Sequence, residues 1–115
     1  MTENPFSVLI VEDSEDWRNL YSAILEAQGL QFVAVASLTE AQAQLQTRKY
    51  THVLTDGLEG EWSGVVKEAN NAGIRNIYVI SGRSGIKLDV SNSGASYVNK
   101  RDIGLGVVNV KDLIK

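Results

Sequence analysis

Polar residues that suit phosphoryl-transfer chemistry stand directly after four short apolar runs. The runs and the residues that end them are 8–11 with Glu12 and Asp13, 53–55 with Asp56, 77–80 with Ser81, and 97–99 with Lys100. Short apolar, β-rich runs separated by helix-length segments predict buried parallel strands. In an open parallel sheet, functional groups gather at the carboxyl ends of the strands. We therefore expect three acids, a hydroxyl and an amine to meet in one pocket.

Such a set of side chains can bind a divalent cation and carry a phosphoryl group. Clustered carboxylates repel one another unless a cation offsets their charge, so Glu12, Asp13 and Asp56 favour Mg²⁺, which prefers oxygen ligands. A carboxylate can itself act as the nucleophile and form an aspartyl phosphate. Transfer of this kind needs mainly positioning and charge neutralisation, which Lys100, the metal and the hydroxyl of Ser81 can supply.

The strands that position these residues alternate with predicted helices. Predicted helices run from after Asp13 to before Gly29, from Ser37 to about 49, over 63–72, over about 86–91, and over about 107–114; predicted strands cover 8–11, 31–36, 52–55, 76–80 and 97–99. Ser37 and Glu40 have the spacing of a capping box. Because strand and helix alternate throughout, the fold class is α/β, a three-layer sandwich around a five-stranded parallel sheet with right-handed crossovers.

Length and composition limit the number of domains and the classes of binding partner that the chain can have. A chain of 115 residues suffices for one domain, residues 1–115, with a real core. A net charge of −3 with scattered basic residues gives no footprint for nucleic acid. We find no apolar stretch long enough to span a membrane, and no signal-peptide pattern in residues 1–6. The absence of cysteine fits a reducing compartment, so we expect a cytoplasmic location.

The residues that end the strands match a known motif. In their order and roughly in their spacing, the acidic pair, Asp56, Ser81, Tyr97 and Lys100 resemble the motif of the receiver domains of two-component response regulators. The resemblance covers essentially the whole chain and is closest to single-domain, chemotaxis-regulator-like receivers. It implies a flavodoxin-like, doubly wound fold and a function in a phosphorelay. It also implies that the chain is not an enzyme with a substrate of its own.

The resemblance also assigns roles to single residues. It implies that Asp56 accepts a phosphoryl group from a histidine kinase or phosphotransfer protein. Glu12, Asp13, Asp56 and the backbone carbonyl of Leu58 would hold Mg²⁺; we expect Asp13 and Asp56 to be direct ligands and Glu12 to act largely through water. Ser81 and Tyr97 would be the switch pair that reports phosphorylation to a downstream protein partner.

The sequence departs from the family at two loops. Glu59 and Gly60 stand where the family usually has Met-Pro, and Arg101 stands where a proline, with a cis peptide bond, usually follows the lysine. A cis bond before a residue other than proline costs about 2.5–4 kcal/mol, so we expect a trans Lys100–Arg101 bond and a displaced start of the last helix. The Gly- and Ser-rich segment 81–96 predicts a short fourth helix. An atypical output face follows from these departures.

Some residues have simpler interpretations. Tyr97 fits a core aromatic nearly as well as a switch, and Ser81 fits an ordinary turn. Trp17 fits the apolar face of the first helix, whereas Trp62 lies in a loop and is expected to be partly exposed. His52 stands at the far end of the strand from Asp56, which favours a structural role.

Three functions fit the residues. The first is the phosphorelay receiver. The second is a binding module with the receiver fold but without regulated phosphorylation, for which the altered loop after Asp56 and the weak fourth helix argue. The third is a phosphatase with an aspartyl intermediate, which ranks last because no second general acid is found. For the receiver we expect slow hydrolysis of the phosphoryl group, since Leu58 cannot orient a water and Arg83 can shield the phosphate.

Overall fold

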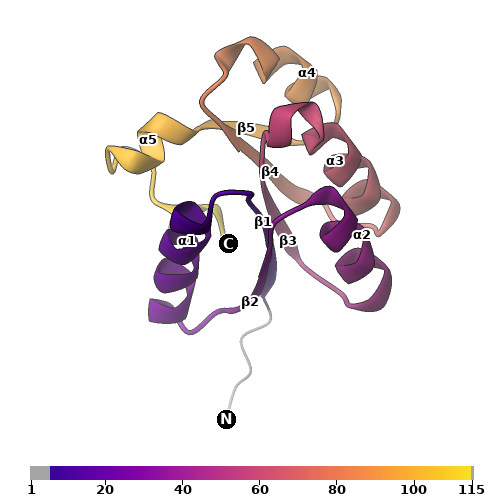
Figure 1. The fold of residues 1–115 in the computed structure, drawn as a ribbon, viewed down its shortest axis with the longest axis horizontal. Helices are drawn as coiled ribbons and strands as arrows, with labels where there is room; N and C mark the ends of the chain where they lie inside the picture. Colours follow the sequence, from indigo (N-terminus) through magenta and orange to yellow (C-terminus); the bar gives the residue numbers. More distant parts are fainter. Residues whose placement is uncertain (1–5, 115) are drawn as a thin grey trace.

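Strands and helices alternate along the chain. The structure, a computed structural model, describes residues 6–114, so residues 1–5 and 115 of the predicted domain lie outside it. The strands and helices are β1 (Ser7–Val11), α1 (Glu15–Ala27), β2 (Gln31–Val35), α2 (Leu38–Thr47), β3 (His52–Asp56), α3 (Trp62–Asn71), β4 (Asn76–Ser81), α4 (Lys87–Asn92), β5 (Ser96–Asn99) and α5 (Lys100–Gly104) (Figure 1). Short 3-10 turns cover Leu58–Gly60, Ser84–Ile86 and Val110–Leu113.

The five strands form one parallel sheet in the order β2-β1-β3-β4-β5. The predicted α/β class and the five-stranded, doubly wound sheet are therefore confirmed. The strand order reverses between β1 and β3, which is where ligands bind in sheets of this type. In the register of that pair, Val11 lies opposite Thr55. The residues one position further on, Glu12 and Asp56, are thus placed next to each other at the carboxyl edge.

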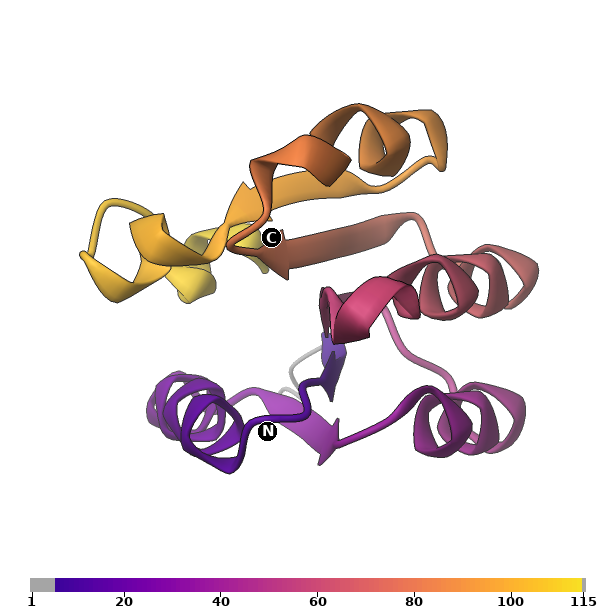
Figure 2. The same ribbon diagram turned by 45° about the horizontal axis from the view of Figure 1, so that its top comes forward.

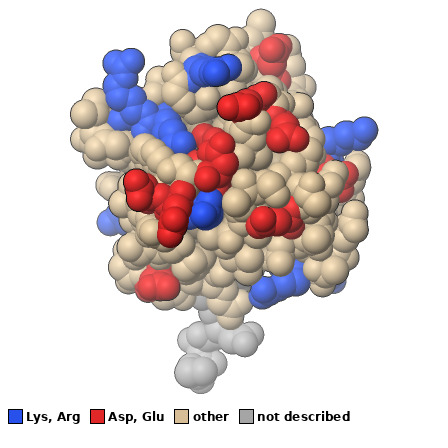
Figure 3. All heavy atoms as spheres, viewed as in Figure 1, with Lys and Arg blue, Asp and Glu red and all other residues tan. Residues whose placement is uncertain are grey.

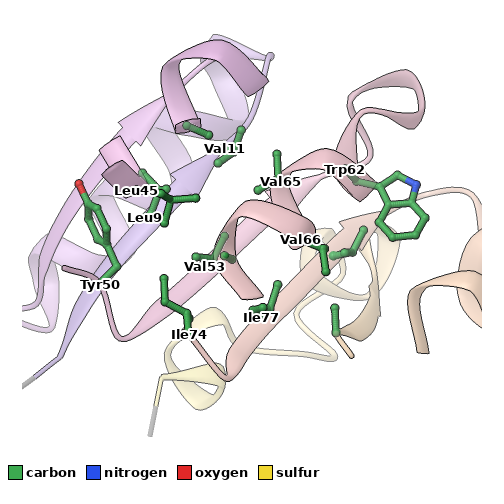
Figure 4. Close-up of a cluster of buried hydrophobic side chains, with 14 of the residues drawn as sticks. Leu9, Val11, Leu45, Tyr50, Val53, Trp62, Val65, Val66, Ile74 and Ile77 are labelled. Carbon is green, nitrogen blue, oxygen red and sulfur yellow. The ribbon is translucent and has the colours of Figure 1, made fainter. Parts of the chain in front are cut away.

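The sheet separates two hydrophobic clusters. On β1, Leu9 and Val11 belong to one cluster and Val8 and Ile10 to the other, as the alternation of side chains along a strand requires. Helices α2, α3 and α4 cover the face of the sheet with the first of these clusters, and α1 and α5 cover the face with the second (Figures 1 and 2). The close-up of the first cluster shows side chains from the strands and from α2 and α3 meeting between the sheet and the helices (Figure 4).

Side-chain caps set the starts of the first two helices. The hydroxyl of Ser14 accepts the backbone N–H of Trp17 at 3.4 Å at the start of α1. At α2, the hydroxyl of Ser37 accepts the N–H of Glu40 at 3.2 Å. The Glu40 carboxylate reaches back to the N–H of Ala36 at 3.1 Å, so the predicted cap is present with its reverse bond displaced by one residue.

The chain after β5 differs from the prediction. We expected a delayed helix over 107–114, but α5 begins at Lys100, directly after the strand, and only a 3-10 turn forms near the end of the chain. Asn99 explains the early start, because its side-chain oxygen accepts the N–H of Arg101 at 2.9 Å and caps the helix. Gly106, with a φ of +77°, ends it, and the β-branched residues that follow resist a new helix.

Two further expectations, for α4 and for the peptide bond after Lys100, are confirmed, and one for Trp62 is wrong. Helix α4 is short, and no cis peptide bond occurs among residues 6–114, so the Lys100–Arg101 bond is trans. Trp62 was expected to be partly exposed in a loop. It is instead the first residue of α3 and is buried in the first hydrophobic cluster, because the preceding 3-10 turn brings the chain back onto the sheet.

Within the described residues, none of the helices has the length and apolar character that a membrane crossing requires.

We predict that Ser37→Ala lowers the free energy of unfolding by about 1 kcal/mol, the usual contribution of a serine helix cap. Urea denaturation measures the change. Thr39→Ala is the matched control, because Thr39 is an exposed residue of the same helix. Equal effects of the two substitutions would contradict a specific role for the cap.

Candidate functional site

The ammonium group of Lys100 lies between two carboxylates at the carboxyl edge of the sheet. Its Nζ atom is 2.6 Å from Oε1 of Glu12 and 2.9 Å from Oδ1 of Asp56. The three residues follow β1, end β3 and begin α5, so the contact joins segments that are 88 and 44 residues apart in the sequence. The structure thus brings together three of the predicted site residues.

Glu12 is the buried member of this group. It is 0% exposed, and its second oxygen accepts the backbone N–H of Ser14 at 3.0 Å. Burial raises the pKa of Glu12 above its ordinary value, while the hydrogen bonds from Lys100 and Ser14 act in the opposite direction. The carboxylate is therefore held in one orientation by two donors.

Lys100 responds to the same neighbours in the opposite sense. Burial by itself lowers the pKa of the Lys100 ammonium, but the hydrogen bonds and charges of Glu12 and Asp56 outweigh that effect and raise it. The site therefore keeps a positive charge beside Asp56.

Asp13 completes an acidic cluster around this pair. One carboxylate oxygen each from Glu12, Asp13 and Asp56 can be chosen so that all three lie within 4.8 Å of one another. Asp13 is exposed, whereas Asp56 is half-buried. Oxygen ligands at this spacing fit a hard divalent cation such as Mg²⁺.

The loop after Asp56 has an unusual backbone. Leu58 and Glu59 have φ angles of 48° and 53°, in the left-handed region that side chains disfavour, and Gly60 follows with 102°. The N–H of Leu58 donates to Oδ2 of Asp56 at 3.2 Å. The Leu58 carbonyl, expected as a metal ligand, accepts the N–H of Glu61 at 3.1 Å. A carbonyl oxygen has a second lone pair, so its role as a ligand stays a prediction.

Ser81 lies at the end of β4 and lines the same cleft as Asp56. Its hydroxyl oxygen accepts the N–H of Arg83 at 3.1 Å, which leaves the hydroxyl proton available for another acceptor. A β-carbon added to Gly57 would lie 3.2 Å from this oxygen, so glycine allows the loop to approach Ser81 closely.

Tyr97 lies at the edge of the sheet, on β5. Its hydroxyl donates to the backbone carbonyl of Ser81 at 2.8 Å, and the ring packs against the first hydrophobic cluster. Both interpretations of Tyr97, as a core aromatic and as a switch residue, are compatible with this contact.

Several of the residues described above line a cleft of about 330 Å³. Its walls include Asp13, Asp56, Leu58, Ser81, Arg83 and Lys100, together with Trp62 and Ile86. On the face drawn in Figure 3, acidic side chains gather near the middle, and the Lys and Arg side chains are spread out without forming a continuous basic patch. The cleft therefore combines acidic side chains with the ammonium group that Glu12 and Asp56 hold.

Two contacts at the site and one residue of the cleft wall were not predicted from the sequence. The Lys100 Nζ atom lies 4.7 Å from the ring centroid of Trp17, which was interpreted only as a core residue. Arg18 donates to the backbone carbonyl of Glu12 at 2.8 Å. Trp62 lines the cleft. The aromatic residue three positions into α1 was a visible signal, but only the fold shows that it meets the lysine.

His52 lies away from the cleft, as expected. It is buried at the start of β3, where its Nδ1 atom is 2.8 Å from the hydroxyl of Thr51 and its ring meets Phe6 edge-on at 5.2 Å between centroids. The structural interpretation of His52 is consistent with this packing.

Comparisons with solved structures identify the fold. A receiver domain of a Francisella response regulator matches with a TM-score of 0.76 and 18% identity, over 93% of this chain and 94% of that one. A CheY-like receiver domain protein from Methanospirillum hungatei matches with a TM-score of 0.73 and 23% identity, over 94% of this chain and 93% of that one. The response regulator TrrA from Thermotoga maritima was solved in complex with Mg²⁺ and beryllofluoride. It matches with a TM-score of 0.71 and 24% identity, over 94% of this chain and 98% of that one.

The sequence itself matches no protein-family model and no curated protein. Identities of 18–24% between chains that superimpose over nearly their whole lengths are evidence of a shared architecture. Function has to be argued from the site, because one fold can carry many activities. The chain has the fold of the receiver domains of response regulators.

Proposed function

We propose that this chain is a phosphorelay receiver domain that accepts a phosphoryl group on Asp56. The observation that carries the proposal is the position of the Lys100 ammonium, 2.9 Å from Asp56 and 2.6 Å from Glu12, at the point where the strand order reverses. A structural ion pair would not need Asp13 and Ser81 at the same cleft. An acceptor site needs all of these groups.

The proposed reaction is a simple transfer. A carboxylate oxygen of Asp56 attacks the phosphorus of a phosphohistidine on a histidine kinase or phosphotransfer protein. The bond from phosphorus to the histidine nitrogen breaks, and the nitrogen keeps the electron pair. Lys100 neutralises the charge of the phosphoryl oxygens, and the hydroxyl of Ser81 donates a hydrogen bond to one of them.

Mg²⁺ is the proposed cofactor. Asp13 and Asp56 are the proposed direct ligands, with Glu12 acting through water and the Leu58 carbonyl as a further ligand. When bound, the metal supplies positive charge to the phosphoryl oxygens. The acidic cluster, and a neighbour in the same fold that was solved with Mg²⁺ and beryllofluoride, support this assignment. The Lys100 ammonium, which pairs with Glu12 and Asp56, offsets part of the negative charge of the cluster.

Output is proposed to occur through protein–protein contact. Ser81 and Tyr97 form the proposed switch pair, and the hydrogen bond from the Tyr97 hydroxyl to the Ser81 backbone carbonyl links the two residues. The chain would act as one domain in the cytoplasm, without nucleic acid or membrane as partner. It would not turn over a substrate of its own, in contrast to a phosphatase.

A second candidate is a binding module that keeps the receiver fold and is not phosphorylated. The strained backbone at Leu58 and Glu59 and the short α4 favour it. The pairing of Lys100 with Asp56 favours phosphorylation instead, because it keeps a cation at the acceptor oxygen.

Acetyl phosphate with Mg²⁺ separates the two candidates. We predict that the wild-type protein gains the mass of one phosphoryl group and that Asp56→Asn does not. The Asp56 carboxylate is the proposed nucleophile, and an amide cannot replace it. Intact-mass spectrometry measures the gain. A gain that persists in Asp56→Asn would contradict the assignment, and a wild-type protein that stays unlabelled would favour the binding module.

Lys100→Ala tests the response rather than the transfer alone. A charge-assisted hydrogen bond from Lys100 is worth about 1.5–3 kcal/mol, so its loss should weaken the change that follows phosphorylation. Amide NMR shifts with and without beryllofluoride measure that change. Arg101→Ala is the control, since Arg101 is exposed and adjacent. Equal shift changes in Lys100→Ala and wild type would contradict a role of Lys100 in the response to phosphorylation.

We predict that Asp13→Ala weakens Mg²⁺ binding by at least about tenfold, since loss of outer-shell groups alone costs that much at metal sites. Amide NMR shifts during a Mg²⁺ titration give the affinity. Asp16→Ala is the control, because Asp16 is an acid near the site that is not part of the cluster. If Asp13→Ala binds as tightly as wild type, the proposed site is wrong.

We predict slow hydrolysis of the phosphoprotein. Hydrolysis needs a water in line with the phosphorus, and the buried apolar side chain of Leu58 cannot orient one. Arg83 lines the cleft and can cover the phosphate. Leu58→Asn and Arg83→Ala should each shorten the lifetime severalfold in a mass-spectrometric time course. Arg75→Ala, at the opposite end of β4, should not; unchanged lifetimes in both site variants would refute the explanation.

A further inference from the structure

The Lys100 ammonium contacts a third group besides the two carboxylates, the indole ring of Trp17. The Nζ atom lies over the ring, 4.7 Å from its centroid. A cation within about 6 Å of an indole centroid is attracted by the negative face of the ring, and more strongly when water is excluded. The Lys100 side chain is only 17% exposed. The ammonium is therefore close enough to the ring, and shielded enough from water, for the cation–π attraction to stabilise its position.

The start of α1 fixes Trp17 against the lysine. The hydroxyl of Ser14 accepts the N–H of Trp17 at 3.4 Å, and the N–H of Ser14 donates to Oε2 of Glu12 at 3.0 Å. The other oxygen of Glu12 accepts the Lys100 ammonium at 2.6 Å. Glu12, Ser14, Trp17 and Lys100 thus form a closed ring of contacts. In this ring the helix cap, the buried carboxylate and the ammonium fix one another.

Neighbouring side chains hold the indole in place. The ring of Tyr21, one turn further along α1, lies 5.7 Å away between centroids. A β-carbon added to Gly104 in α5 would lie 3.8 Å from the Cη2 atom of Trp17. The indole is therefore packed between α1 and α5, at the helix whose first residue is Lys100.

We propose that Trp17 is a positioning residue for Lys100. Its π face holds the ammonium beside Asp56, so that the charge is in place when a phosphoryl group arrives. This inference rests on the proposed function, because the position of the ammonium has a chemical consequence only if Asp56 is an acceptor. What matters at position 17 is then an aromatic face, and not apolar bulk alone.

The experiment compares Trp17→Phe, which keeps a smaller aromatic face, with Trp17→Leu, which keeps only apolar bulk. Phe32→Leu is the matched control, because Phe32 is a partly buried aromatic packed against the same hydrophobic cluster. Thermal unfolding establishes that each variant is folded. The first readout is the NMR shift of the Lys100 ε-methylene protons, which the indole ring current moves upfield. The second is the rate of labelling by acetyl phosphate with Mg²⁺.

We expect the upfield shift of Lys100 to shrink in Trp17→Phe, to vanish in Trp17→Leu and to persist in Phe32→Leu. The labelling rate should fall about fivefold in Trp17→Leu, the scale of one partly shielded cation–π contact, and less in Trp17→Phe. The rate of Phe32→Leu should match that of the wild type.

Three results would overturn the inference. One is an unshifted Lys100 in the wild type, and another is a shift that disappears in Trp17→Leu without a change in labelling rate. The third is an equal fall in rate for Trp17→Phe, Trp17→Leu and Phe32→Leu, which would indicate packing alone. A wild-type protein that is not labelled contradicts the proposed function instead, while the lysine shift still reports on the Trp17 contact.

Discussion

The structure depends on one buried charge and the cation that compensates it. Glu12 is completely buried, and an unpaired carboxylate in that position would be costly. Lys100 offsets the cost, and removing one partner of a buried ion pair typically destabilises a protein by about 3–5 kcal/mol. Because Lys100 also reaches Asp56, this cation joins the carboxyl ends of β1 and β3 to the first residue of α5. The interaction that stabilises the edge of the sheet is thus the one that the proposed chemistry uses.

Strain is concentrated beside this charge cluster. Among the described residues, Leu58 and Glu59 are the two residues other than glycine with positive φ, and they lie in the loop directly after β3. A left-handed conformation costs an ordinary residue about 1–2 kcal/mol. The N–H of Leu58 donates to Asp56, and the Leu58 side chain is buried in the first hydrophobic cluster, so both interactions support this conformation. Strained backbone that persists at a cleft is typical of functional sites.

Much of the site could be predicted from the sequence because strand ends follow from topology. Once the apolar runs are assigned as parallel strands, the residues that follow them must share one edge of the sheet. Glu12, Asp56, Ser81 and Lys100 could therefore be expected to lie close together without knowledge of side-chain contacts. The end of the chain was predicted wrongly, because the cap by Asn99 and the stop at Gly106 outweigh the apolar spacing of residues 107–114. The burial of Trp62 and the contact between Trp17 and Lys100 could not be predicted. Both depend on how a loop or helix start lies over the sheet, which local patterns do not specify.

We propose that the Lys100 ammonium neutralises the charge of a phosphoryl group on Asp56. The most direct test is a crystal structure of the protein with Mg²⁺ and beryllofluoride, a mimic of the phosphoryl group. We predict beryllium bound to a carboxylate oxygen of Asp56, with the Lys100 ammonium and the Ser81 hydroxyl donating to its fluorides and Mg²⁺ beside Asp13. An Asp56 without beryllofluoride under these conditions, with Lys100 still bridging Glu12 and Asp56, would contradict the account.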